Sequence, residues 1–75
     1  MVTSIDLSSI AAELAVIADA VDRYGQRVTD LVQGELPRLD PEGRHDDLLS
    51  ALHEAERSLR VSHRGLTRSQ RLASQ

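Results

Sequence analysis

The sequence predicts an all-α protein: an antiparallel helical hairpin of two long helices that dimerises into a four-helix bundle. Three observations support this prediction. Apolar residues recur at steps of three and four over residues 7–31, a similar series runs over residues 48–73, and a stretch containing Gly and Pro separates them. Such spacing places apolar side chains on one stripe of a helix, and two helices joined by a short linker pack side by side.

The first helix is predicted over residues 3–35. Thr3 followed by Asp6 has the spacing of a capping box, which favours a helix start at Thr3. Gly34 is a common C-terminal stop, and Pro37 disfavours helix in the residue before it. Between these signals the seam is unbroken: Leu7, Ile10, Leu14, Ile17, Val21, Tyr24, Val28 and Leu31.

The second helix is predicted over residues 40–70, after a linker at 36–39. Asp40-Pro41-Glu42 combines an N-cap residue, a proline at the first helical position and an acid near the positive end of the helix dipole. Its seam alternates large and small residues: Leu48, Leu52, Ala55, Leu59, Ser62, Leu66, Ser69 and Ala73. Gly65 weakens this helix, and the end from Ser69 onward is expected to fray.

The two seams can be laid against each other in one antiparallel register. Val28 then lies opposite Leu48, Val21 opposite Ala55 and Ile17 opposite Leu59, with the turn near residue 38. Agreement between both seams and the linker favours a hairpin formed from the whole of residues 1–75 as a single domain.

A second stripe of small residues lies beside the first seam. A face this wide fits a bundle better than a solitary hairpin, and a chain of 75 residues needs more burial than one hairpin supplies. The sequence therefore predicts a dimer or partner interface at Ala11, Ala15, Ala18 and Gly25.

The composition favours a non-enzymatic, cytoplasmic protein without a cofactor. There is no cysteine, no apolar run long enough to span a bilayer, and no basic and apolar leader at the start. Glu42 and His45 have the Glu-x-x-His spacing of di-iron bundles, but no second copy accompanies them, so no metal site is predicted. Tyr24, the only aromatic residue, falls on the seam and is interpreted as a packing residue.

The one distinctive polar feature is a row of arginines at steps of three and four along the second helix: Arg57, Arg60, Arg64, Arg68 and Arg71. Three interpretations stay open for this row: a solvated face, a site for an acidic protein, and a contact with a nucleic-acid backbone.

The layout resembles the small Trp-x-Gly family of type VII secretion substrates, the early-secreted-antigen-like proteins of actinobacteria. Gly34 in Val32-Gln33-Gly34 stands where that family has the glycine of Trp-x-Gly, whereas Val28 follows Tyr24 where the family's export signal has an acid. All nine basic residues are Arg, a bias typical of a GC-rich genome. The resemblance implies a helical hairpin that dimerises, and export without a signal peptide.

The function predicted from these observations is a protein–protein interaction module that homo- or heterodimerises, as a secretion-type partner, an adaptor or a small chaperone. The alternative is a small nucleic-acid-associated regulator that uses the arginine row.

Overall fold

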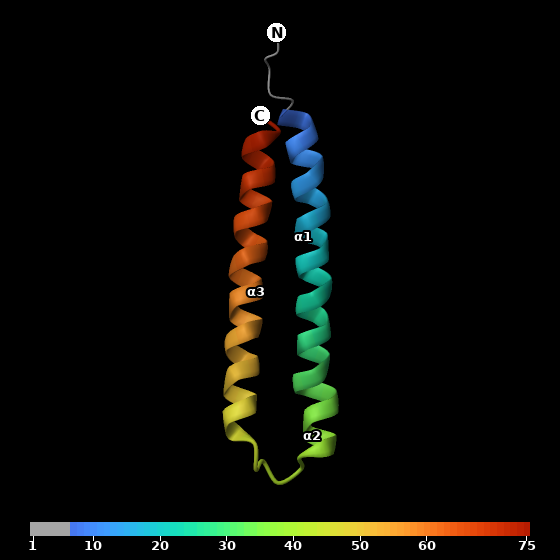
Figure 1. The fold of residues 1–75 in the computed structure, drawn as a ribbon, viewed down its shortest axis with the longest axis vertical. Helices are drawn as coiled ribbons and strands as arrows, with labels where there is room; N and C mark the ends of the chain where they lie inside the picture. Colours follow the sequence, from blue (N-terminus) through green and yellow to red (C-terminus); the bar gives the residue numbers. More distant parts are fainter. Residues whose placement is uncertain (1–6) are drawn as a thin grey trace.

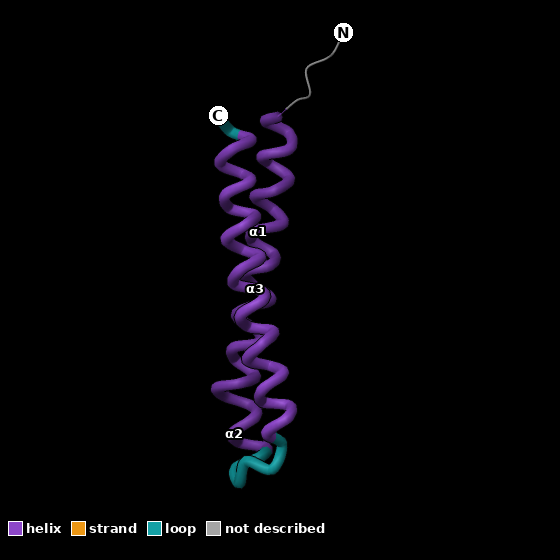
Figure 2. The backbone as a smooth tube through the Cα atoms, turned by 90° about the vertical axis from the view of Figure 1, so that its left-hand side faces the viewer, coloured by secondary structure: helices purple, strands orange, loops and turns teal. Residues whose placement is uncertain are grey.

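The computed structural model describes residues 7–75 and shows two long helical arms that run antiparallel and meet at a short loop (Figure 1). The first arm consists of α1 (Leu7–Asp30), a π-helical turn η1 (Leu31–Glu35) and α2 (Leu36–Leu39), and the second arm is α3 (Asp46–Ala73). Figure 2 shows the same two arms from the side, with the loop at one end. The predicted all-α hairpin is confirmed. The capping box predicted at Thr3 and Asp6 lies outside the described residues.

The first arm stays helical past Gly34 and Pro37, whereas the sequence predicted an end by residue 35. The π-helical turn explains how the proline is tolerated, because Leu36 donates its N–H to the carbonyl of Leu31, five residues back. A proline inside an α-helix clashes with the carbonyl four residues earlier, and a wider turn relieves that clash. The arm ends when the N–H of Asp40 bonds the carbonyl of Leu36 at 2.8 Å.

Asp40 organises the loop rather than starting the second helix. Its carboxylate accepts hydrogen bonds from the backbone N–H groups of Arg44 and His45, at 3.0 and 2.9 Å. Its carbonyl accepts the N–H of Gly43 at 3.1 Å, and Gly43 has a φ of 66°, which only glycine adopts readily. The prediction that α3 begins at Asp40 is therefore wrong by six residues, because Asp40 caps a turn that precedes the helix.

The longer loop changes the register between the arms. Thr29 donates a hydrogen bond to Glu56 at 2.8 Å, whereas the predicted register placed it opposite Asp47. A Cβ built on Gly25 would lie 3.9 Å from the Cβ of Leu59. The predicted register is thus wrong by about eight residues, or about 12 Å along the helix axis.

The contact between the arms is made by one row of residues on each helix, which we call the inward rows. On the first arm the row consists of Ala11, Leu14, Ala18, Val21, Gly25, Val28 and Val32, and on α3 it consists of Leu49, Leu52, Glu56, Leu59, His63, Leu66, Gln70 and Ala73. Ala11, Ala18, Val32 and Glu56 are buried, and the others are half-buried. Small residues at Ala11, Ala18 and Gly25 allow the helices to approach closely.

The inward row of α1 corrects two sequence-based expectations. Ala11, Ala18 and Gly25 were expected to face a partner, yet they face α3 of the same chain, and Ala15 is half-buried beside them. Of the predicted seam, only Leu14, Val21 and Val28 belong to the inward row.

None of the helices within residues 7–75 is long and apolar enough to cross a membrane.

Candidate functional site

The hairpin has two different sides, and the register tells which residues belong to each. In an antiparallel helix pair, the residues that directly precede the inward row on both helices lie on one side, and those that directly follow it lie on the other. A cavity between the helices is lined by Asp22, Thr29 and Arg60, all of the second kind, which agrees with this assignment.

The preceding residues form a surface that we call the apolar face. On the first arm its large side chains are Ile10, Ile17, Tyr24 and Leu31, joined at the end by Leu7, and they are 42 to 58% exposed. On α3 the same side carries a row without any charge: Leu48, Ala51, Ala55, Ser58, Ser62, Gly65, Ser69 and Leu72. Leu48 and Leu72, at its two ends, are 47% and 54% exposed. Half-exposed large apolar side chains gathered on one side of a small domain make that side the candidate interaction site.

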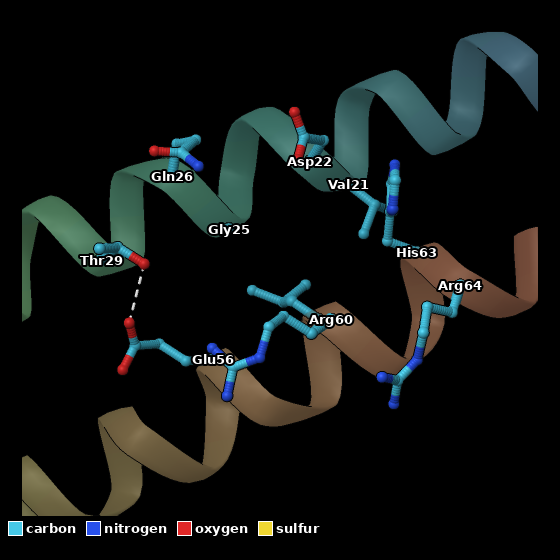
Figure 3. A pocket seen from close by; sticks show the side chains of 10 residues that line it. Val21, Asp22, Gly25, Gln26, Thr29, Glu56, Arg60, His63 and Arg64 are labelled. Carbon is cyan, nitrogen blue, oxygen red and sulfur yellow. Dashed lines mark hydrogen bonds between the residues drawn. The ribbon is translucent and has the colours of Figure 1, made fainter. Parts of the chain in front are cut away.

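The opposite side holds a cavity of about 330 Å³, which we call the polar groove (Figure 3). Its lining residues come from both helices: Val21, Asp22, Gly25, Gln26 and Thr29 from α1, and Glu56, Leu59, Arg60, His63 and Arg64 from α3. The groove opens at Gly25 because this position has no side chain to fill the space beside Leu59.

Glu56 is the buried polar residue at one end of the groove, and it is only 9% exposed. Its carboxylate accepts a hydrogen bond from the Thr29 hydroxyl at 2.8 Å (Figure 3). The same carboxylate lies 3.0 Å from Nδ1 of His53. The Thr29 bond, followed by His53 and the charge of Arg60, outweighs burial and lowers the pKa of Glu56. A carboxylate kept ionised in this way holds the register of the helices and is a poor general acid at neutral pH.

Sequence reasoning missed Glu56 and its partners, although a signal was present. Leu49, Leu52, Leu59 and Leu66 are spaced at three, seven and seven residues along one stripe of the helix. Glu56 occupies the place in this stripe between Leu52 and Leu59. A charged residue at such a position indicates a buried polar contact.

All five arginines of the predicted row are exposed on α3. Arg60 and Arg64 line the polar groove, and Arg68 is not among its lining residues. Within residues 7–75 none of the five forms an ion pair. The row therefore presents positive charge away from the centre of the apolar face, and the charge of Arg60 acts on the carboxylate of Glu56.

The histidines lie apart from one another. His45 is near Asp40 in the loop, with 3.3 Å between Nδ1 and the carboxylate; His53 contacts Glu56; and His63 lines the groove. No group of three His, Cys, Asp or Glu side chains among residues 7–75 is arranged to hold a metal ion. Glu42 and His45, for which no metal site was predicted, both lie in the loop before α3, so the two residues do not share a helical face.

Comparisons of the chain with protein-family models, with curated proteins and with solved structures gave no match.

Proposed function

We propose that this chain is a non-enzymatic protein–protein interaction module that binds a helical protein, or another copy of itself, through the apolar face. One observation carries the proposal: the large apolar side chains of α1 at Ile10, Ile17 and Tyr24 are about half exposed, while alanines occupy the inward row beside them. In a solitary hairpin this arrangement leaves the larger hydrophobic side chains in water. A partner that covers them gains the free energy of burying them.

The interaction module fits the roles of an adaptor, a small chaperone or a secretion partner, each of which acts by holding another helix. The polar groove supports the module by fixing the relative positions of α1 and α3. Glu56 and Thr29 tie the helices together on the groove side, so the apolar face on the other side keeps one shape.

The test compares the wild-type chain with Ile17→Glu at micromolar concentrations. We expect the wild-type chain to associate in light scattering, or to enhance the fluorescence of an apolar dye if it stays monomeric. Ile17→Glu should weaken either signal at least tenfold, because it places a charge at the centre of the apolar face. Gln26→Glu, at the groove, is the matched control and should change neither signal more than twofold.

A folded wild-type monomer that neither associates nor binds the dye would contradict the proposal. So would equal losses in Ile17→Glu and Gln26→Glu, because the effect would then not depend on the apolar face.

A second candidate function is favoured by the five arginines that form no ion pair within residues 7–75. Guanidinium groups along one helix can contact successive phosphates, so the chain would act as a small nucleic-acid-associated regulator. In that case the chain should be retained on duplex DNA, with an affinity that falls steeply as salt increases. Arg64→Ala combined with Arg68→Ala should reduce both the affinity and its salt dependence. Retention that ignores salt, or no retention at low salt, would exclude this function.

A further inference from the structure

The two helices contribute unlike halves to the apolar face. The first arm supplies large side chains at Ile10, Ile17, Tyr24 and Leu31. The central part of α3 supplies only small ones: Ala51, Ala55, Ser58, Ser62, Gly65 and Ser69. Large residues on one helix pack best against small ones on the facing helix, and this chain carries both halves of such a contact.

We propose that the partner on the apolar face is a second copy of this chain, with α1 of each copy on α3 of the other and both loops at the same end. The inference rests on the proposed function and names its partner. A twofold axis parallel to the helices produces this arrangement, because it carries α1 across the interface to face the other copy's α3. A twofold axis across the helices would instead pair α1 with α1 and place the loops at opposite ends.

A twofold axis parallel to the helices leaves the position of each residue along the helix axis unchanged. The register between α1 and α3 within one hairpin is therefore also the register between α1 of one copy and α3 of the other. At that register three of the large residues each lie between two small ones, whereas Ile10 lies beside Leu72 of the second copy near the end of the face. Tyr24 lies between Ser58 and Ser62 of the second copy, and Ile17 lies between its Gly65 and Ser69. Leu31 meets the other copy's Ala51 and Ala55 in the same way. These are the contacts of knobs packed into holes.

Gly65 supports a contact from outside the hairpin. Among residues 7–75, a Cβ added at this position would meet nothing within 4 Å, so no packing within this part of the chain requires glycine there. Glycine in the middle of a helix lowers its stability relative to alanine. In the proposed dimer, Gly65 makes room for Ile17 of the other copy.

The hydroxyl of Ser69 can be covered by a partner without losing a hydrogen bond. It donates to the carbonyl of Gly65 in its own helix at 2.8 Å. Ser69 is therefore compatible with a dry interface, since a buried hydroxyl with a partner carries no desolvation penalty for a lost bond.

Charges at the rim of the apolar face are complementary in the same arrangement. Glu13 and Arg27 are exposed on the outer edge of α1, and Arg68 and Glu54 are exposed on the outer edge of α3. At the proposed register Glu13 approaches Arg68 of the second copy, and Arg27 approaches its Glu54. Two pairs of opposite sign favour this pairing of helices over one of α1 with α1.

The available area suits a stable dimer. The 28 residues of α3 span about 42 Å, and two adjacent helices are about 20 Å wide. The face thus offers about 800 Å² per copy, which is the size of a standard specific interface.

Distances between spin labels decide the arrangement in the full chain. The sequence has no cysteine, so Glu42→Cys provides a single labelling site in the loop, far from the apolar face. With both loops at one end, the two labels should lie about 30 Å apart or less. With loops at opposite ends, the length of the helices would separate them by about 45 Å or more. Arg23→Cys, near the middle of the first arm, should give a short distance in either arrangement and serves as the control.

Gly65→Leu tests the hole that receives Ile17. Because no described residue has an atom within 4 Å of a Cβ at this position, the variant should keep the helicity of the hairpin, yet its dimer should dissociate at least tenfold more readily. Ser50→Leu adds the same side chain at an exposed site of α3 outside the apolar face and should change the dissociation constant less than twofold.

Short distances at residue 42 together with dissociation in Gly65→Leu are the expected results. Long distances at residue 42, with short ones at residue 23, would overturn the arrangement while leaving the proposed interaction module intact. A folded monomer that still binds the apolar dye through Ile17 would overturn the choice of a second copy as the partner. Equal dissociation in Gly65→Leu and Ser50→Leu would contradict the proposed contact between Gly65 of one copy and Ile17 of the other.

Discussion

The two sides of the hairpin are built from the same helices and differ only in which residues flank the inward rows. On the groove side, Thr29, Glu56 and His53 form a hydrogen-bonded cluster with defined partners. On the apolar face, Ile17 and Tyr24 are about half exposed and the facing row of α3 carries no charge. Polar contacts have strict geometry, whereas apolar contacts gain mainly from area. The hydrogen bond that fixes the register therefore lies on the groove side, and the apolar face is the side on which we propose association.

The largest expected loss of unfolding free energy comes from a substitution in the inward row, which lies between the two sides. Ala18 is 5% exposed within the chain, so Ala18→Glu forces a carboxylate between α1 and α3. We expect the hairpin itself to lose about 3 kcal/mol of unfolding free energy, rather than only to dissociate. Urea unfolding followed by circular dichroism measures the loss. Ala12→Glu, on the exposed surface of the same helix, should cost no more than about 0.5 kcal/mol, and an equal loss there would contradict the inward row.

A smaller effect tests whether the groove side sets the register. Thr29→Val and Glu56→Leu each break the hydrogen bond between the helices, so the double variant should lose less unfolding free energy than the two single losses together. Thr29→Val combined with Asp47→Ala should be additive, because Asp47 lies far along α3 from Thr29. Additivity in the first pair, or coupling in the second, would favour the register predicted from the sequence.

The pH dependence of the unfolding free energy tests the groove side, because the ionised carboxylate of Glu56 lies there. The pKa of Glu56 is lowered from its usual value of 4.5, chiefly by the hydrogen bond from Thr29. A lowered pKa in the folded state adds stability that is fully present above the unfolded value and is lost as the pH falls through the folded value. The urea midpoint should therefore fall as the pH is lowered below about 4.5, and it should fall less in Glu56→Gln.

Asp40 contributes to the same acid response, because the backbone N–H of Arg44 is the main cause that lowers its pKa. Asp40→Asn should remove the part of the pH dependence of stability that comes from Asp40, because among residues 7–75 this carboxylate bonds only to the loop. Identical pH profiles for the wild type and Glu56→Gln would show that Glu56 gains no stabilisation from its ionised form.

The smallest expected effect is a gain at Gly25, where the groove opens. A Cβ at this position would make an ordinary contact with Leu59, so Gly25→Ala should stabilise the hairpin by about 0.5 to 1 kcal/mol. Association through the apolar face should not change, because Gly25 belongs to the inward row and opens on the other side. Thermal unfolding and light scattering on the same samples check both statements, and a destabilised variant would mean that the helices are closer at Gly25 than its 3.9 Å contact indicates.

The sequence by itself determined that the chain is two helices folded back on each other. Steps of three and four place apolar residues on one stripe whatever surrounds the helix, and Gly and Pro mark the bend locally. The arginine row on the exposed surface of α3 could be read for the same reason, since its spacing is a property of one helix.

Only the tertiary structure decided which stripe faces inward and where the helices meet. α1 carries two overlapping stripes that share Leu14, Val21 and Val28: one is completed by alanines and glycine, the other by Ile10, Ile17, Tyr24 and Leu31. Spacing alone cannot choose between them, because both obey the same repeat. The register depended on one local contact, in which Asp40 caps a turn rather than a helix, and on one long-range contact, in which Thr29 meets Glu56 across 27 residues of sequence. Contacts between residues so far apart leave no periodic trace in the chain, so they appear only when the two helices are placed together.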